Sequence, residues 1–346
     1  MVKYAIQRIL LAFLTAFIIL SLTYILLAAL PADRSVGNDN QLFAFYNDQV
    51  SLGFALDLPH EDKSLGDYLW HYYQTETKLW HYYYKKPVFD QYLSWISNIF
   101  TKWNWGTSTK YKLGFSCMTI IGERLPLSMS INIISVIISV PLGILLGILA
   151  GLKKNTWIDH TISTLVMIFI SIPSFVIITF SLWIFAYQLG WVPTQWPSAD
   201  SSAFVKFQGY ILPVLALSFG SICGYCRFVR AELCEVMSSE YLLLARTKGL
   251  TKNQAITRHA LKNAFVPILP SILAEFIGIL GGSMILESLY GIPGYGEIYV
   301  KALNLKDYNL LMVDMAVFTM IGLLANIVLD LSYGFIDPRI RVGAKK

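Results

Sequence analysis

The chain has 346 residues, of which 55% are hydrophobic and 14% charged, and its formal net charge is +5. Charged residues make up about a quarter of an ordinary soluble domain, so this composition excludes one. The chain instead contains long apolar runs, and a run of about 18 or more such residues is typical of a membrane-spanning helix. The cations lie at the ends of these runs, where orientation in the membrane explains them. They therefore do not indicate a nucleic-acid-binding protein.

Residues 1–31 are expected to form a first transmembrane helix with a cytoplasmic N-terminus. Lys3 and Arg8 precede an apolar run, Ile9–Leu30. A signal peptide starts in the same way, but its apolar core is normally about 7–15 residues long, so we favour a retained span. Residues 32–117 are the only long polar section, and we expect them to form an extracytoplasmic loop or small domain.

This polar section contains a near-repeat, Leu-Trp-His-Tyr-Tyr, at residues 69–73 and again at 79–83. The aromatic side chains could form an interfacial belt, a docking surface for an external partner, or the core of a small domain. We favour the belt or the core. His71 and His81 could bind a metal ion, but no neighbouring cysteine or acidic pattern in the sequence supports such a site.

Residues 118–346 are expected to hold five further spans. These are Leu125–Leu152, Ile158–Leu189 with Pro173 inside it, Tyr210–Phe228, Pro267–Tyr290 and Leu310–Ile336. Neighbouring helices can take up the backbone groups that a proline leaves unbonded in a membrane. With the N-terminus inside, the short cytoplasmic segments receive most of the lysines and arginines, as orientation rules require. The predicted fold class is an all-α membrane protein with about six spans and both termini in the cytoplasm.

Two sets of small residues lie along faces of these predicted helices. They are Gly143, Gly147, Gly151 and Gly278, Gly281, Gly282. Small residues let membrane helices approach closely. The partner helix could belong to the same chain or to a second membrane subunit.

A basic, partly amphipathic segment, Glu240–Pro270, lies in the predicted cytoplasmic loop 229–266. Good helix formers from Tyr241 to Lys248 predict a short helix, and Gly249 is placed as its C-terminal cap. Thr251 can then cap a second helix. A helix–glycine–helix unit on the cytoplasmic side has a suitable shape for a lever that a partner protein grips.

The sequence contains no catalytic constellation. It lacks the pattern G-x-x-x-x-G-K-[ST], so we expect no nucleotide-binding loop of the usual kind. Ser283 follows two glycines, but the pattern G-x-S-x-G is absent and no histidine lies in a predicted span to act as its base. Cys223 and Cys226 have no second pair, so we expect them to pack helices rather than hold a metal. We expect neither a cofactor nor a metal in this chain.

Four acidic residues lie in or near the last two predicted spans: Glu275, Glu287, Asp314 and Asp330. Acids in lipid are costly, and they often mark a transport pathway or an interhelical hydrogen bond. We expect the last three to lie near span ends and to be partly solvated. Glu275 lies deeper and either lines a pathway or bonds a neighbouring helix. With Glu287 and Ser283 it forms our set of candidate pathway residues.

Several motifs, taken in order, resemble the permease subunits of binding-protein-dependent ABC importers, in the oligopeptide, dipeptide and nickel branch. The resemblance covers nearly the whole chain. Its cytoplasmic part is Tyr241-x-x-x-Ala245-Arg246-x-Lys248-Gly249 followed by Arg258-His259-Ala260-Leu261-Lys262-Asn263-Ala264, which is similar to the coupling loop of that branch. Other motifs are Glu123-Arg124-Leu125-Pro126, Ser171-Ile172-Pro173-Ser174-Phe175, Pro293-Gly294-x-Gly296, Asp307-Tyr308 and Asp337-Pro338-Arg339-Ile340-Arg341.

The sequence departs from the broad family pattern in four places, of which two are His259-Ala260-Leu261-Lys262 at the I-x-L-P position and Asn309, where a proline often follows the Asp-Tyr pair. Leu243-Leu244-Ala245 stands where the family has Glu-Ala-Ala before its glycine, as in the peptide branch. Asn104-Trp105 replaces the usual Gly-Asp before Gly106, and the outer section looks divergent. The resemblance is therefore closer on the cytoplasmic side than on the outer side.

The resemblance implies a type I ABC importer permease in the bacterial cytoplasmic (inner) membrane, forming half of a translocation pathway. It implies a heterodimer with a second homologous permease, two ATP-binding subunits that hold ATP and Mg²⁺, and an extracytoplasmic substrate-binding protein. The chain itself would not be an enzyme. The residues implied to couple to an ATP-binding subunit are Glu240, Tyr241, Ala245, Arg246, Lys248, Gly249, Arg258 and His259.

The expected cargo is an oligopeptide, with dipeptides, nickel or another small solute as alternatives. An ion-coupled secondary transporter that uses the membrane acids is the alternative from a different class.

Overall fold

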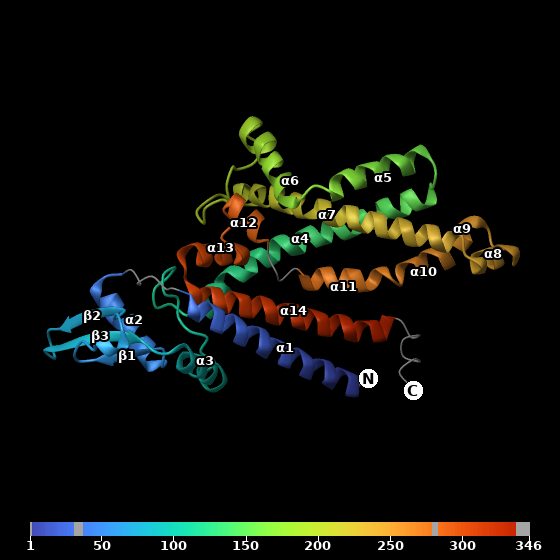
Figure 1. The fold of residues 1–346 in the computed structure, drawn as a ribbon. Coiled ribbons are helices and arrows are strands. Elements are labelled where there is room, and N and C mark those ends of the chain that lie inside the picture. The colour runs from blue at the N-terminus through green and yellow to red at the C-terminus, as the bar shows by residue number, and fades with distance from the viewer. Residues whose placement is uncertain (1, 31–36, 279–282, 337–346) are drawn as a thin grey trace. The chain divides into compact units, whose positions relative to one another are not determined.

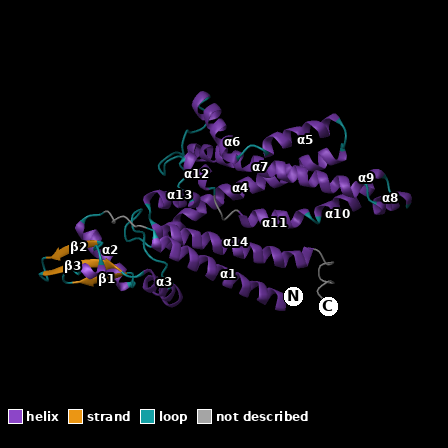
Figure 2. Cartoon of the chain, viewed as in Figure 1, coloured by secondary structure: helices purple, strands orange, loops and turns teal. Residues whose placement is uncertain are grey.

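The computed structural model describes residues 2–30, 37–278 and 283–336. These residues are mostly helical, and their three strands all lie in the outer section (Figures 1 and 2). The chain divides into two compact units. The first unit comprises Met1–Leu125 and Glu297–Met320, and the second comprises Pro126–Gly296 and Ile321–Lys346.

Four of the described helices are long and apolar enough to cross a membrane. They are α1 (Val2–Ala29), α4 (Cys117–Leu152), α7 (Ala203–Met237) and α14 (Tyr308–Ile336). They correspond to the first, second, fourth and sixth predicted spans, which confirms the helical membrane class. Both α4 and α7 extend beyond the predicted apolar ranges, because apolar residues mark only the part of a helix that can lie in lipid.

The third predicted span is a bent pair of helices. The helix α5 (Trp157–Ile170) and the helical stretch Ser174–Gln188 meet at 95°. The second part begins as α6 (Ser174–Ser181) and continues as a π-helical segment, Leu182–Gln188. Pro173 lies at the break in an extended conformation, with φ −61° and ψ 146°. Pro173 therefore breaks the helix of the third predicted span, because proline lacks an N–H and keeps the residue before it out of the helical region. That the two parts form one span stays a prediction.

The fifth predicted span, Pro267–Tyr290, contains α11 (Ile268–Gly278) and α12 (Met284–Tyr290). Residues 279–282, which include Gly281 and Gly282, lie outside the described residues, as does the motif at 337–341. The described residues therefore give four spans, or five if the bent pair counts as one, and the total of six stays a prediction. The predicted outer loop after this span contains a further helix, α13 (Tyr295–Leu305).

The outer section is a folded domain rather than a loop. Two helices, α2 (Asp39–Ser51) and α3 (Val88–Lys102), accompany an antiparallel sheet in the order β1-β3-β2. The strands are β1 (Ala55–Leu58), β2 (Trp70–Gln74) and β3 (Leu79–Lys85), and a short 3₁₀ turn spans Lys63–Leu65. The sheet adds to the expected all-α class. The sequence hides it because aromatic residues occupy both faces of its strands, which removes the usual apolar–polar alternation.

The near-repeat forms the two paired strands β2 and β3. Trp70 pairs with Tyr83, and Tyr73 pairs with Trp80. Tyr83 is buried among Leu42, Phe45 and Tyr46 of α2, whereas Tyr73 and Trp80 are exposed. The core interpretation is thus confirmed for one face of the sheet.

The glycines of α4 pack against α7 of the same chain. A Cβ on Gly147 would lie 2.7 Å from the Cβ of Val229 and 2.8 Å from the carbonyl oxygen of Cys226. Gly143 and Gly151 meet residues of α7 in the same way. Contact within the chain, the first of our two alternatives, is confirmed for these three glycines. Cys223 and Cys226 are also buried beside α5, so they pack helices as expected.

Candidate functional site

The basic segment after α7 forms the predicted helix–glycine–helix unit. Its first helix, α8 (Glu240–Thr247), ends in a turn at Gly249, whose φ is +97°. The amide of Lys248 donates to the carbonyl of Leu244 at 3.1 Å, and that of Gly249 donates to the carbonyl of Arg246 at 3.0 Å. Glycine suits this position because residues with a Cβ rarely adopt positive φ.

The second half of the unit begins where the sequence predicts. The Thr251 side chain accepts from the amide of Gln254 at 3.3 Å, and the Gln254 side chain accepts from the amide of Thr251 at 3.1 Å. This reciprocal cap starts α9 (Lys252–Ala255), which continues through a π-helical turn, Ile256–Ala260, into α10 (Leu261–Phe265). π-Helical turns are rare in proteins, and those that occur often lie at functional sites. This one carries Arg258 and His259, both exposed.

The inner face of α8 is packed against the second half of the unit. Leu242 and Ala245 are buried, and Leu242 packs in one cluster with Ala255, Ile256 and Leu233. Of the predicted coupling residues, Ala245 is therefore turned inward.

The outer face of α8 is apolar and exposed. Tyr241 is 42% exposed, Leu243 63% and Leu244 55%, and the cations Arg246 and Lys248 lie beside them on the surface. Figure 1 shows α8 and α9 gathered at one end of α7. A groove of about 210 Å³ runs between these elements, lined by Met237, Ser238, Ser239, Leu242, Leu243, Arg246, Lys252, Ala255 and Ile256. Exposed apolar residues bordered by charge are typical of a protein–protein contact.

An ion pair that the sequence analysis missed joins α5 to α7 near this segment. Arg230 Nε donates to Asp159 Oδ1 at 2.5 Å, and its Nη2 donates to Oδ2 at 2.8 Å. Asp159 is 1% exposed and also accepts from the amide of Asn155 at 2.9 Å. The one available signal was an arginine inside an apolar helix, since such a residue usually has a partner. The two-point contact fixes the end of α7 from which α8 departs.

Glu275, on α11, faces α7. The hydroxyl of Ser221 donates to its carboxylate, and Tyr225 also hydrogen-bonds to it. A pocket of about 430 Å³, open to the surface, adjoins the carboxylate; it is called the cavity below. Glu275 therefore bonds a neighbouring helix and lines a cavity as well.

Glu287 and Asp314 are each 3% exposed, so the expectation of partial solvation is wrong for both. Glu287 accepts from the amide of Ser283 at 3.2 Å. A Cβ on Gly294 would overlap the Glu287 carboxylate, so the turn after α12 covers this acid. Asp330 is half-buried. Ser283 lies at the start of α12, and it is its backbone amide, not its hydroxyl, that donates to Glu287.

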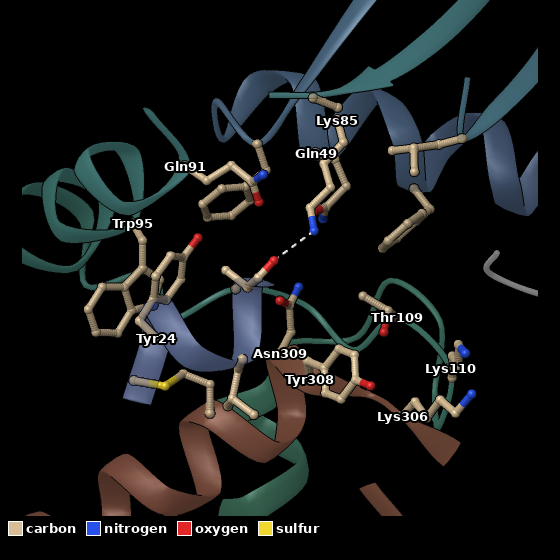
Figure 3. A pocket seen from close by; sticks show the side chains of 18 of the residues that line it. Tyr24, Gln49, Lys85, Gln91, Trp95, Thr109, Lys110, Lys306, Tyr308 and Asn309 are labelled. Atoms are coloured by element: carbon tan, nitrogen blue, oxygen red, sulfur yellow. Dashed lines mark hydrogen bonds between the residues drawn. The ribbon is translucent and has the colours of Figure 1, made fainter. Parts of the chain in front are cut away.

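The first unit contains a cavity of about 150 Å³ between the outer domain and the ends of α1 and α14. Figure 3 shows Tyr24 and Trp95 on one side and Tyr308 and Lys306 on another. Lys85 reaches across to donate to the carbonyl of Ala28 at 2.9 Å. Burial lowers the pKa of Lys85. This contact ties β3 to the last turn of α1.

Asp307 organises the loop that precedes α4. Its carboxylate is fully buried and accepts from the Ser108 hydroxyl at 2.6 Å and from the Thr109 hydroxyl at 3.0 Å. The amides of Lys110 and Tyr111 donate to it at 2.9 and 3.0 Å. The sequence marked Asp307 only as part of a motif, because its partners lie almost two hundred positions away.

Comparisons with known proteins agree with the resemblance drawn from the motifs. Residues 143–342 match the family model described as "Binding-protein-dependent transport system inner membrane component". The dipeptide transport system permease protein DppB of Lactococcus lactis subsp. cremoris is 32% identical over 342 residues, which cover 99% of this chain and 100% of that protein. The oligopeptide transport system permease protein OppB of Escherichia coli (strain K12) is 32% identical over 74% of this chain and 81% of its own length. The glutathione transport system permease protein GsiC of Shigella flexneri is 28% identical over 99% of both chains.

Two solved structures are more distant. An amino acid ABC transporter is 18% identical, with 62% of this chain and 92% of that chain covered and a TM-score of 0.46. The inward-facing MetNI methionine ABC transporter is also 18% identical, with 65% and 96% covered and a TM-score of 0.46.

Proposed function

This chain belongs to the family of binding-protein-dependent transport system inner membrane components, and from that membership we propose that it forms half of a peptide pathway. In this proposal a partner protein binds the outer face of α8 and moves the permease through it. The membership makes it a permease subunit of an ABC importer in the bacterial inner membrane. Its relatives are named for dipeptides, oligopeptides and glutathione, which are all peptides. Their shared chemistry supports a peptide as the cargo of this chain.

The observation that carries the coupling role is the two-sided character of α8. Leu242 packs its inner face against Ala255 of α9 and Ala245 is also buried, while Tyr241, Leu243 and Leu244 are exposed. A soluble segment that keeps such apolar side chains in water has a partner to cover them. In our proposal this partner is one of two ATP-binding subunits, which hold ATP and Mg²⁺. A second homologous permease completes the pathway, and an extracytoplasmic binding protein delivers the peptide.

The mechanism follows from the stiffness of the segment. When the ATP-binding subunits close on ATP, the groove around α8 moves, and α8 moves with it because its inner face is packed and its end is capped at Gly249. The movement passes through α9 and α10 into α11 and through the packed contact into α7, which Asp159 and Arg230 hold to α5. Relative motion of these helices would turn the pathway outward. The other proposed coupling residues, Glu240, Arg246, Lys248, Arg258 and His259, are exposed and can add polar contacts to the partner.

A charge introduced on the outer face of α8 tests this proposal. Leu243→Asp should lower the amount of ATP-binding subunit that co-purifies with the permease by about tenfold or more, since a buried unpaired charge costs several kcal/mol. Lys262→Glu, which changes an exposed charge on α10, is the matched control and should leave co-purification nearly unchanged. Normal retention of the ATP-binding subunits by the Leu243→Asp variant would contradict the assignment. Peptide uptake driven by an ion gradient in the absence of ATP would contradict the ABC mechanism itself.

A further inference from the structure

A half-buried carboxylate lies on α11 of the second unit, within a predicted membrane span. Glu275 on α11 is bonded by Ser221 and Tyr225 of α7. Both of these residues lie within the apolar range Tyr210–Phe228 of α7. An acid within a membrane span usually faces the interior or a water-filled cavity and marks a pathway.

The space beside Glu275 is larger than an interhelical hydrogen bond requires. The cavity of about 430 Å³ is lined by Ser221, Gly224, Tyr225, Phe228, Ser271, Ala274 and Glu275. No heavy atom lies within 4 Å of the place that a Cβ on Gly224 would occupy. This open pocket has a mostly apolar lining and room for a small ligand group beside the carboxylate.

The chemistry of the walls favours a cation. Among the described residues that line the cavity none is a lysine, arginine or histidine, and the two groups bonded to Glu275 are neutral hydroxyls. A carboxylate has about four lone-pair sites, so two hydroxyls leave acceptor capacity for an ammonium group. The rings of Tyr225 and Phe228 add faces that attract cations.

We propose that this cavity binds the α-ammonium group of the translocating peptide, with Glu275 as its counter-charge and the hydroxyls of Tyr225 and Ser271 as flanking groups. The inference rests on the proposed peptide function. It makes Glu275 a specificity-determining residue of the membrane pathway, separate from any selection made by the binding protein. The competing interpretation is that Glu275 only bonds α11 to α7.

The test measures peptide binding to the detergent-solubilised complex of permeases and ATP-binding subunits, without the binding protein. The probes are trialanine and N-acetyl-trialanine, which differ in the terminal charge. The wild-type complex should bind trialanine about tenfold more tightly, since one charge-assisted hydrogen bond is of that order. Glu275→Gln keeps an acceptor oxygen but removes the charge, and should reduce this preference to within about twofold. Glu235→Gln removes an exposed carboxylate of α7 that does not line the cavity, and should keep the preference.

Filling the cavity gives a second measurement. Gly224→Leu should weaken binding of both peptides. Gly220→Leu lies one turn away on α7, also has open space at its Cβ position and does not line the cavity, so it should not. Equal affinity of the wild-type complex for the two peptides, absence of binding, or a preference that survives Glu275→Gln would overturn the inference. ATP-driven trialanine uptake by the complete system, measured in parallel, separates the outcomes. Uptake without the preference refutes only the ammonium site, whereas no peptide uptake refutes the proposed function.

Discussion

Replacing Gly249 should weaken the coupling segment through the backbone and not through the size of the new side chain. The φ of +97° lies in the region that L-residues rarely adopt, and no heavy atom lies within 4 Å of the Cβ position. Gly249→Ala and Gly249→Leu should therefore destabilise the turn by similar amounts, about 1–2 kcal/mol. Gly249→Asn should cost less, because asparagine tolerates left-handed conformations better.

A cost of about 1–2 kcal/mol corresponds to a change of roughly 5- to 30-fold in the equilibrium between the ordered and the opened turn. Hydrogen exchange of the α8 amides, Glu240–Thr247, in the purified permease without ATP-binding subunits measures this equilibrium. Peptide uptake by the assembled complex should fall in the same order, with Asn above Ala and Leu. Wild-type exchange in the Ala variant would refute the backbone argument. Exchange in the Leu variant about tenfold faster than in the Ala variant would show that side-chain volume matters and that the site is not open.

Three further predictions concern the packing, the ion pair and the outer domain. Gly147→Ala should lower the free energy of unfolding by about 1–3 kcal/mol because α7 must move away. The control Gly122→Ala, on the same helix with open space at its Cβ position, should be neutral or stabilising in thermal unfolding, and equal losses would contradict the close contact. Asp159→Asn should lower the free energy of unfolding by an amount near the lower end of about 3–5 kcal/mol, because the Arg230 side chain is 32% exposed. Adding Arg230→Met should recover part of that loss in the same assay, and no recovery would argue against the pair. Burial raises the pKa of Asp48, so between its usual and its raised pKa the folded protein binds more protons than the unfolded one. Stability should therefore be greatest below the usual carboxyl pKa and fall as the pH rises through this window. Asp48→Asn should flatten that slope in melting experiments, and an unchanged slope would assign it to another group.

The coupling segment could be predicted from the sequence because its determinants are local. Helix propensity, the reciprocal cap of Thr251 and Gln254, and the preference of glycine for positive φ all act within a few residues. The inward turn of Ala245 could not be predicted in the same way. It depends on how α8 packs against the rest of the segment, part of which, including α9, follows only after the turn at Gly249.

The sequence by itself determined the membrane class, the positions of the long helices and the absence of a nucleotide-binding loop, because apolar run length and short motifs are properties of neighbouring residues. The tertiary structure decided which distant polar groups meet. It pairs Asp159 with Arg230 across 71 positions, gathers a loop around Asp307, covers Glu287, and opens a cavity beside Glu275. The physical reason is that a polar group in a dry interior needs a hydrogen-bond partner. The periodicity of the sequence does not identify which distant residue that partner is. Only the packing of α4, α5, α7 and α11 brings the second unit's groups together.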